Sequence, residues 1–402
     1  MIFDYKPDKI ILEKYSNLLV NFALNGGRGI KKGDTVLLIV PEIAKPILHF
    51  LRNSVLRAGG HCIINYLPDN IARDFYELAS EEQLNFFLNK YYKGLVEQID
   101  HSIYIHADCN PLELRGVDPK KIMMRNKTLR PYSEWKNKKE NLGRFSWTMA
   151  LYGTKAMAKE AGLSFREYWR QIIHACYLDD EDPIAKWKSI FFEIDEIKNK
   201  LNSFEIEKLR IIADGTDLIV GLGKNRKWLG GSGRNMPSFE VFISPDWRLT
   251  EGMIKFTEPL YRYGNLITNV TLEFSNGRVS KFSAEKGEDV LREMIASENA
   301  DKIGEFSLTD SRFSRINKFM ATTLYDENVG GKFGNTHVAL GNAYKDSYSG
   351  NPSKVSKKKW AEMGYNESAV HTDIVSTLNR KVIAFLKNGE EKIIYENGKF
   401  VI

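Results

Sequence analysis

The sequence predicts an α/β N-terminal domain with a parallel sheet, followed by an α+β domain with mostly antiparallel strands. The first third of the chain alternates β-branched runs with helical patterns, which is typical of βαβ units. Beyond residue 203 the pattern changes to closely spaced strand pairs joined by tight turns. A length of 402 residues is more than a single hydrophobic core usually serves, so we expect two domains, 1–183 and 184–402.

The N-terminal elements alternate strand and helix in chain order. Residues 36–40 are apolar at every position, as expected for a strand that helices cover on both faces. An acidic turn, Asp179–Pro183, ends this part of the chain, and its proline is placed to open a new helix. The predicted elements are a strand at 35–40, a helix at 43–58, a strand at 61–67, a helix to about Lys93, a strand at 102–106 and mainly helix from 164 to 203.

The sequence of the second half predicts hairpins and one helix. Residues 209–213 and 216–222 flank an Asp-Gly turn, and residues 270–274 and 279–282 flank an Asn-Gly turn. A helical pattern covers Glu288 to Ala296. Because short antiparallel pairs here accompany a helix, this half is predicted to be an α+β domain.

Composition and charge exclude several classes of protein. A hydrophobic content of 43% and an aromatic content of 12% predict a folded chain. The 58 basic and 52 acidic residues are interspersed, so the net charge of +6 does not indicate a nucleic-acid partner. The three cysteines are far apart, which argues against a zinc ribbon or disulfide scaffold and favours a reducing compartment. Charges near the N-terminus and the absence of long apolar runs predict a cytoplasmic protein with no membrane partner.

The most informative pair of residues is His371 and Asp373, which are two apart in a run that ends in Ile374 and Val375. On a strand both side chains project from one face. An imidazole and a carboxylate that converge in this way can bind one divalent ion, because zinc and related metals accept nitrogen and oxygen ligands. The alternative is an ordinary surface pair.

A second cluster contains Glu327, His337 and Tyr344, with glycines at 330, 331 and 334 that mark a loop between the first two residues. A histidine such as His337, taken alone, is more often a hydrogen-bonded core residue than a metal ligand, and a glutamate such as Glu327, taken alone, is usually solvated.

Two glutamates occur in apolar surroundings: Glu240 lies in the run Phe239–Ile243, and Glu305 lies in Ile303–Phe306. Burying a carboxylate is costly unless it is paired or bound to a metal. The alternative for Glu240 is an outward position on a half-exposed strand. For Glu305 the adjoining glycine makes a turn equally compatible with the sequence.

Taken together, these segments resemble the thermophilic metalloprotease family of aminopeptidases. The resemblance is ordered along the chain, and nearly the whole length takes part in it. The segments that carry it are Glu113–Pro119, Met157–Gly162, Asp182–Trp187, Asn235–Phe242, Ile303–Glu305, Asp326–Asn328, His337–Tyr344 and Asn366–Asp373.

The resemblance implies an α+β catalytic metal-binding domain and a hydrolase that releases N-terminal amino acids from peptides with a free N-terminus. It implies two divalent ions (zinc, cobalt, manganese or magnesium), a bridging role for Glu305 and a tyrosine, Tyr344, that hydrogen-bonds the reacting carbonyl. It also implies a homodimer. The implied metal ligands are Glu240, Glu305, His337, His371 and Asp373, with Glu327 a further ligand or near neighbour.

Two other functions remain compatible with the residues. Two-metal chemistry also serves hydrolysis of other bonds, such as a phosphoester. A catalytically silent protein that binds a small ligand on its parallel sheet is the third reading.

Overall fold

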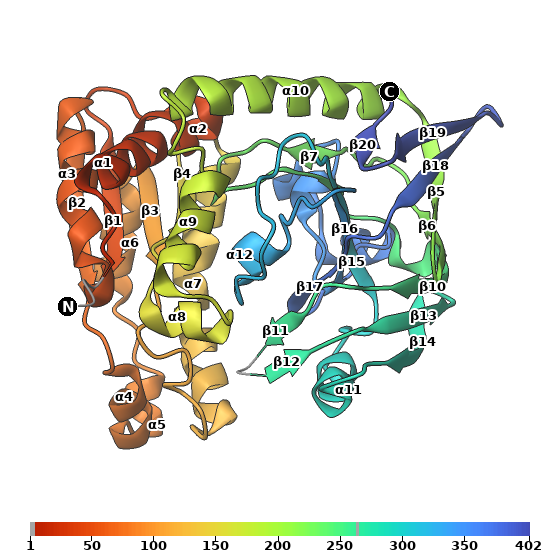
Figure 1. Ribbon diagram of the computed structural model, residues 1–402. Coiled ribbons are helices and arrows are strands. Elements are labelled where there is room, and N and C mark those ends of the chain that lie inside the picture. Colours follow the sequence, from red (N-terminus) through yellow and green to blue (C-terminus); the bar gives the residue numbers. More distant parts are fainter. Residues whose placement is uncertain (1–4, 263–264) are drawn as a thin grey trace. The chain divides into compact units, whose positions relative to one another are not determined.

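The computed structural model describes residues 5–262 and 265–402, which form two compact units (Figure 1). Unit 1 comprises Met1–Lys186 and Ser232–Pro237, and unit 2 comprises Trp187–Gly231 and Ser238–Ile402. The chain therefore enters unit 2, returns briefly to unit 1 and then completes unit 2. The expected division into two domains, 1–183 and 184–402, stays a prediction.

Unit 1 is built on a five-stranded sheet in which every neighbouring pair of strands is parallel. Strand order in this sheet is β2-β1-β3-β4-β8. Residues Val36 to Leu38 and Val40 are at most 2% exposed, so helices cover this strand on both faces as its sequence predicted. The strands are β1 (Thr35–Pro41), β2 (His61–Leu67), β3 (His101–His106), β4 (Ser146–Leu151) and β8 (Asn235–Met236).

The last strand of this sheet, β8, comes from the short segment that returns to unit 1. Met149 and Ala150 of β4 pair with Asn235 and Met236. The returning segment packs closely, because a Cβ atom added at Gly233 would collide with the backbone of Ala23. The parallel sheet is therefore completed by residues from the middle of the chain.

Between residues 72 and 98 the helices of unit 1 differ from the predicted pattern. There the structure has three short helices instead of one helix to Lys93, because Ser80 and Gln83 form a capping box that starts a new helix. The helices are α1 (Lys9–Leu18), α2 (Leu24–Gly27), α3 (Lys45–Arg57), α4 (Ala72–Leu78), α5 (Glu81–Leu84), α6 (Asn89–Gln98), α7 (Pro119–Asn141), α8 (Lys155–Glu160) and α9 (Phe165–Ala175), followed by α10 (Pro183–Ser203), which continues into unit 2.

Unit 2 contains two larger antiparallel sheets and a small hairpin. An eight-stranded sheet has the order β14-β13-β10-β6-β5-β18-β19-β20, and a five-stranded sheet has the order β17-β16-β15-β9-β7. The eight-stranded sheet is formed by β5 (Ile206–Ala213), β6 (Thr216–Gly221), β10 (Thr250–Lys255), β13 (Thr271–Ser275), β14 (Arg278–Ser283), β18 (Arg380–Leu386), β19 (Glu391–Glu396) and β20 (Lys399–Phe400). The five-stranded sheet is formed by β7 (Leu229–Gly230), β9 (Glu240–Ile243), β15 (Ile303–Thr309), β16 (Asn335–Gly341) and β17 (His371–Ser376).

Both predicted hairpins are present, since β5 pairs with β6 and β13 pairs with β14. At the second turn Asn276 and Gly277 both have positive φ, which is the conformation that an Asn-Gly turn adopts. The small hairpin and the remaining helices are β11 (Leu260–Arg262), β12 (Asn265–Ile267), α11 (Glu288–Ala296), α12 (Thr323–Asp326) and α13 (Lys357–Glu362). The predicted fold class, a parallel α/β part followed by a mostly antiparallel α+β part, is confirmed.

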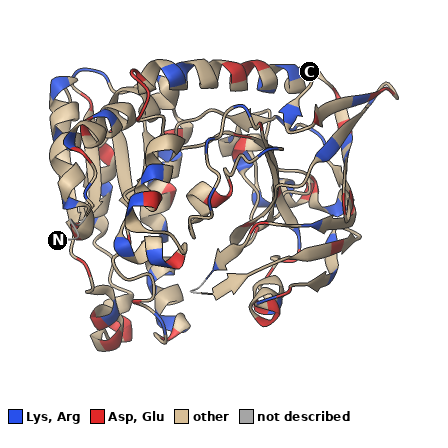
Figure 2. Ribbon diagram, in the orientation of Figure 1, with Lys and Arg blue, Asp and Glu red and all other residues tan. Residues whose placement is uncertain are grey.

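Charged residues of both signs are mixed within each unit, as the sequence indicated (Figure 2). Among the described residues, no helix is both long enough and apolar enough to cross a membrane.

Candidate metal centre

Four neighbouring strands of the five-stranded sheet carry a group of polar side chains on one face. Strand register places Glu305 and Asp373 opposite Ala339, and His337 opposite Ser307. Glu240 pairs with Thr309 at the next position of the same face. Because alternate residues of a strand share a face, all these residues and His371 project to the same side of the sheet.

Glu305 holds its place in the strand through a β-bulge. The pairing of β15 with β16 shifts register between Ile303 and Glu305. A Cβ atom added at Gly304 would collide with the carbonyl oxygens of Gly341 and Asn342, so this position requires glycine. The alternative reading of Glu305 as a turn residue is wrong, and the glycine marks a bulge instead.

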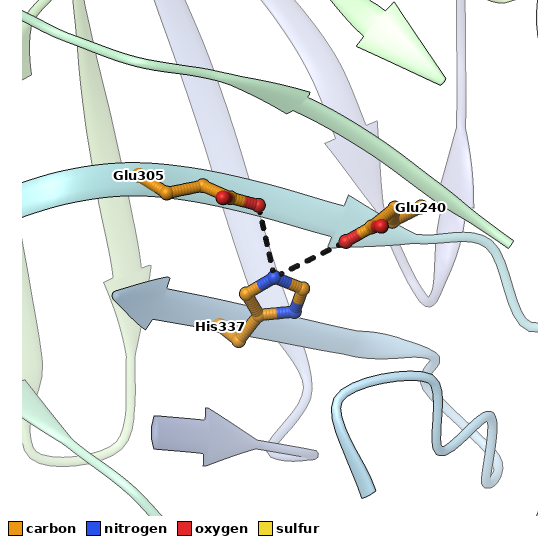
Figure 3. Close-up of side chains that lie close together, drawn as sticks. All are labelled: Glu240, Glu305 and His337. Carbon is orange, nitrogen blue, oxygen red and sulfur yellow. Dashed lines mark hydrogen bonds and ion pairs between the residues drawn. The ribbon is translucent and has the colours of Figure 1, made fainter. Parts of the chain in front are cut away.

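The side chains form two groups that share Glu305. In one group, Nε2 of His337 lies 3.3 Å from Oε1 of Glu305 and 3.4 Å from Oε2 of Glu240 (Figure 3). In the other, Nε2 of His371 lies 3.4 Å from Oε2 of Glu305 and 3.3 Å from Oδ1 of Asp373. Within each group the potential ligand atoms all lie within 4.8 Å of one another. The two oxygens of Glu305 therefore face different groups.

The donor set and its spacing fit divalent cations. Ligands at about 2.0–2.1 Å from a tetrahedrally coordinated ion lie roughly 3.3–3.4 Å apart, which is the spacing observed between imidazole nitrogens and carboxylate oxygens. Direct N–H···O hydrogen bonds are usually shorter than this, at about 2.7–3.2 Å. Glu305 is 3% exposed and His337 is 1% exposed, so these charges are buried and require compensation.

The other ring nitrogen of each histidine faces a backbone carbonyl. Nδ1 of His337 lies 3.2 Å from the carbonyl oxygen of Glu327, and Nδ1 of His371 lies 2.7 Å from that of Asn342. An imidazole that donates from Nδ1 leaves Nε2 free to bind an ion, and the contact fixes the orientation of the ring.

Comparison with known proteins assigns the chain to a family. The thermophilic metalloprotease (M29) family matches residues 8–400. The chain belongs to this family. It is therefore a hydrolase of the metalloprotease class, which confirms the resemblance and the prediction of an enzyme.

Relatives of this family member match over almost their full length. Aminopeptidase T of Thermus thermophilus is 29% identical over 97% of this chain and 98% of its own. Aminopeptidase AmpS of Bacillus subtilis is 28% identical over 97% of this chain and 98% of its own. The solved structure of wild-type AmpT from Thermus thermophilus superposes with a TM-score of 0.83, at 26% identity, over 98% of this chain and all of that one.

Burial and neighbouring charges shift the pKa values of the candidate ligands in opposite directions. Burial lowers the pKa of His337, but Glu240 and Glu305 outweigh it and hold that pKa well above its usual value. Burial likewise opposes protonation of His371, and Asp373 raises its pKa. Burial raises the pKa of Asp373, but His371 outweighs it and the pKa falls to about 2. The site thus favours positive charge in its centre.

Glu327 lies beside the two groups and belongs to neither. Burial, and then the charge of Glu240, raises the pKa of its carboxyl group well above the usual range. Its carboxylate accepts a hydrogen bond of 3.3 Å from the amide of Asn328, and its backbone carbonyl receives the amide of Asn335 at 3.0 Å. The sequence analysis did not identify either asparagine as a residue that orients Glu327. Asn328 nevertheless follows Glu327 directly in the segment Asp326–Asn328, which carries the family resemblance.

Tyr344 lies next to one of the candidate ligands. The centroid of its ring is 4.8 Å from that of His371, and the residue as a whole is 42% exposed. Loss of solvation and the charge of Glu305 raise the pKa of its phenol well above the usual value. The hydroxyl therefore stays protonated at neutral pH and can donate a hydrogen bond.

Proposed function

We propose that the chain is a metal-dependent aminopeptidase that uses two divalent ions to hydrolyse the first peptide bond of substrates with a free N-terminus. The observation that carries this proposal is the shared carboxylate: Glu305 offers one oxygen to each of two ligand groups. The matched relatives named as aminopeptidases support the choice of substrate end.

We assign Glu240 and His337 to one ion, His371 and Asp373 to the other, and Glu305 to both. Bound divalent cations would lower the pKa of a water molecule toward neutrality and stabilise negative charge on a carbonyl oxygen. A carboxylate must carry the proton from the attacking water to the leaving amine, and we assign this step to Glu305.

Tyr344 is proposed to donate a hydrogen bond to the oxyanion that forms from the substrate carbonyl. Its exposed side chain and its place beside His371 support this role. Glu327 is proposed as a further ligand or a neighbour that adds negative charge. Zinc, cobalt, manganese and magnesium all accept carboxylate ligands, and imidazole favours the transition metals.

We further propose that the protein acts in the cytoplasm as a homodimer. Three cysteines without disulfides agree with a reducing compartment. Size-exclusion chromatography with light scattering measures the mass directly, and a monomer at assay concentration would contradict the dimer.

The decisive experiment follows release of free amino acids from a matched pair of peptides, one unblocked and one N-acetylated. We expect release from the unblocked peptide only, loss of activity with chelator, and recovery with added zinc, cobalt or manganese. Internal cleavage of the acetylated peptide would show a different peptidase. A phosphodiesterase assay on the same preparation tests the other two-metal chemistry, and activity there without peptide hydrolysis would overturn the proposal.

A further inference from the structure

Arg380, the first residue of β18, is a buried cation that donates hydrogen bonds to backbone carbonyl groups. Arg380 is only 3% exposed. Nη1 donates to the carbonyl oxygen of Phe333 at 3.2 Å, and Nη2 donates to that of Ser376 at 2.9 Å and also to that of Leu378. Within residues 5–262 and 265–402 no carboxylate forms an ion pair with it, and Tyr395 is the ionisable group that acts on its charge. Burying a cation without a counter-charge is costly, so its hydrogen bonds must be held in place by the surrounding fold.

Tyr395 of β19 completes the arrangement from the neighbouring strand. Its hydroxyl lies 2.9 Å from the carbonyl oxygen of Thr309 and 3.1 Å from that of Phe333. The centre of the Arg380 guanidinium lies 5.9 Å from the centroid of the Tyr395 ring. A Cβ atom added at Gly334 would collide with the Tyr395 hydroxyl, so the backbone approaches this tyrosine as closely as glycine allows.

The carbonyls that these two side chains hold belong to the ends of three strands with candidate metal ligands. Thr309 ends β15, the strand of Glu305, and Ser376 ends β17, the strand of His371 and Asp373. Phe333 lies just before β16, the strand of His337. Arg380 and Tyr395 themselves belong to the eight-stranded sheet, so they join one sheet to the ligand-bearing strands of the other.

We propose that Arg380 and Tyr395 form a latch that positions the metal ligands; this inference rests on the proposed metal site. The ligand carboxylates repel one another when no cation is present, which favours separation of the strands. The latched carbonyls lie three to five residues from the ligands, which corresponds to about 10–17 Å along a strand. Fixed strand ends resist this separation and keep the ligands at the spacing that an ion requires. Less of the free energy of metal binding is then spent on ordering the ligand side chains. Both latch residues are positioning residues that do not touch the substrate.

The test compares zinc binding by Tyr395→Phe and Arg380→Lys with that of the wild type, using competition with a chromophoric chelator. We expect each variant to bind zinc about 10- to 100-fold more weakly. The zinc concentration that gives half-maximal peptidase activity should rise by the same factor, and activity should return at high zinc. Circular dichroism before each titration establishes that the variant is folded.

Matched controls come from unit 1, which contains none of the candidate ligands. The Tyr15 hydroxyl donates to the carbonyl of Leu151 at 3.1 Å, so Tyr15→Phe removes an equivalent buried hydrogen bond. Arg125 donates to the carbonyl of Phe86 at 2.8 Å and lies over the ring of Phe75. Arg125→Lys is therefore the control variant for Arg380→Lys. We expect both controls to bind zinc as the wild type does.

Each outcome decides one proposal. Folded Tyr395→Phe that binds zinc as tightly as the wild type would overturn the latch and leave the metal site intact, and this variant decides the matter if Arg380→Lys does not fold. If the control variants lose as much zinc affinity, the loss reflects a general loosening of the fold, and the latch proposal would also be overturned. Wild-type protein that binds no divalent metal would overturn the proposed metal site and the latch together.

Discussion

Replacing Glu305 with glutamine keeps the size of the side chain and removes one negative charge from between the two candidate ligand groups. Ligand atoms in each group lie within 4.8 Å of one another, so an ion among them is less than about 4 Å from Glu305. At that distance a pair of unit charges is worth on the order of 4 kcal/mol at an effective dielectric constant of about 20. Since about 1.4 kcal/mol corresponds to a factor of ten, we expect turnover to fall by roughly a thousandfold or more.

The assay measures kcat for an unblocked peptide together with bound metal by elemental analysis. Glu251→Gln is the control, because this carboxylate accepts a hydrogen bond from Asn276 in a turn and belongs to neither ligand group. Thermal unfolding of the metal-free Glu305→Gln protein should remain close to that of the wild type. Turnover within tenfold of the wild type, with normal metal content, would refute the assignment of Glu305 to both ions.

Three further predictions concern the same centre. Exhaustive chelation should abolish peptidase activity, and full activity in protein shown by elemental analysis to be metal-free would contradict the mechanism. His371→Ala and Asp373→Ala should each lose one ion and keep the other, because both side chains belong to the same group; metal counting that finds two tightly bound ions in both variants would remove them from the ligand set. Tyr344→Phe should lower kcat by roughly 10² to 10³ while metal content is unchanged, and an unaltered kcat would exclude its hydroxyl from the reaction.

Local patterns in the sequence predicted much of the fold. The apolar run of β1, the Asn-Gly turn between β13 and β14 and the proline that opens α10 each act over a few residues, and each lies where the pattern placed it. The long helix α7 was not predicted, because no residue along it is buried and its side chains lack an apolar stripe. The strand β8 was missed because two residues that pair with a distant strand leave no periodic signal.

The candidate site was also predictable only where its geometry depends on residues close together in the sequence. Spacing alone indicated that His371 and Asp373 share a face, since that follows from the geometry of one strand. Spacing could not place Glu240, Glu305 and His337 beside them, because the register between strands depends on contacts that are distant in sequence. The family resemblance supplied that set, and the structure brings its members together. Neither residue spacing nor the family resemblance predicted the proposed latch. Arg380 and Tyr395 bind backbone carbonyls, which every residue has, so the sequence carries no sign of these contacts.

The return of residues 232–237 to unit 1 constrains how the protein is made. A nascent chain that has emerged only as far as Lys186 lacks β8, so β4 presents an unpaired strand edge until some fifty more residues have been synthesised. Unpaired edges promote pairing with other chains, and the ribosome adds only about 5–20 residues per second, so the exposure lasts for seconds. A fragment cut at Lys186 would retain that edge permanently and should aggregate more readily than the full-length protein.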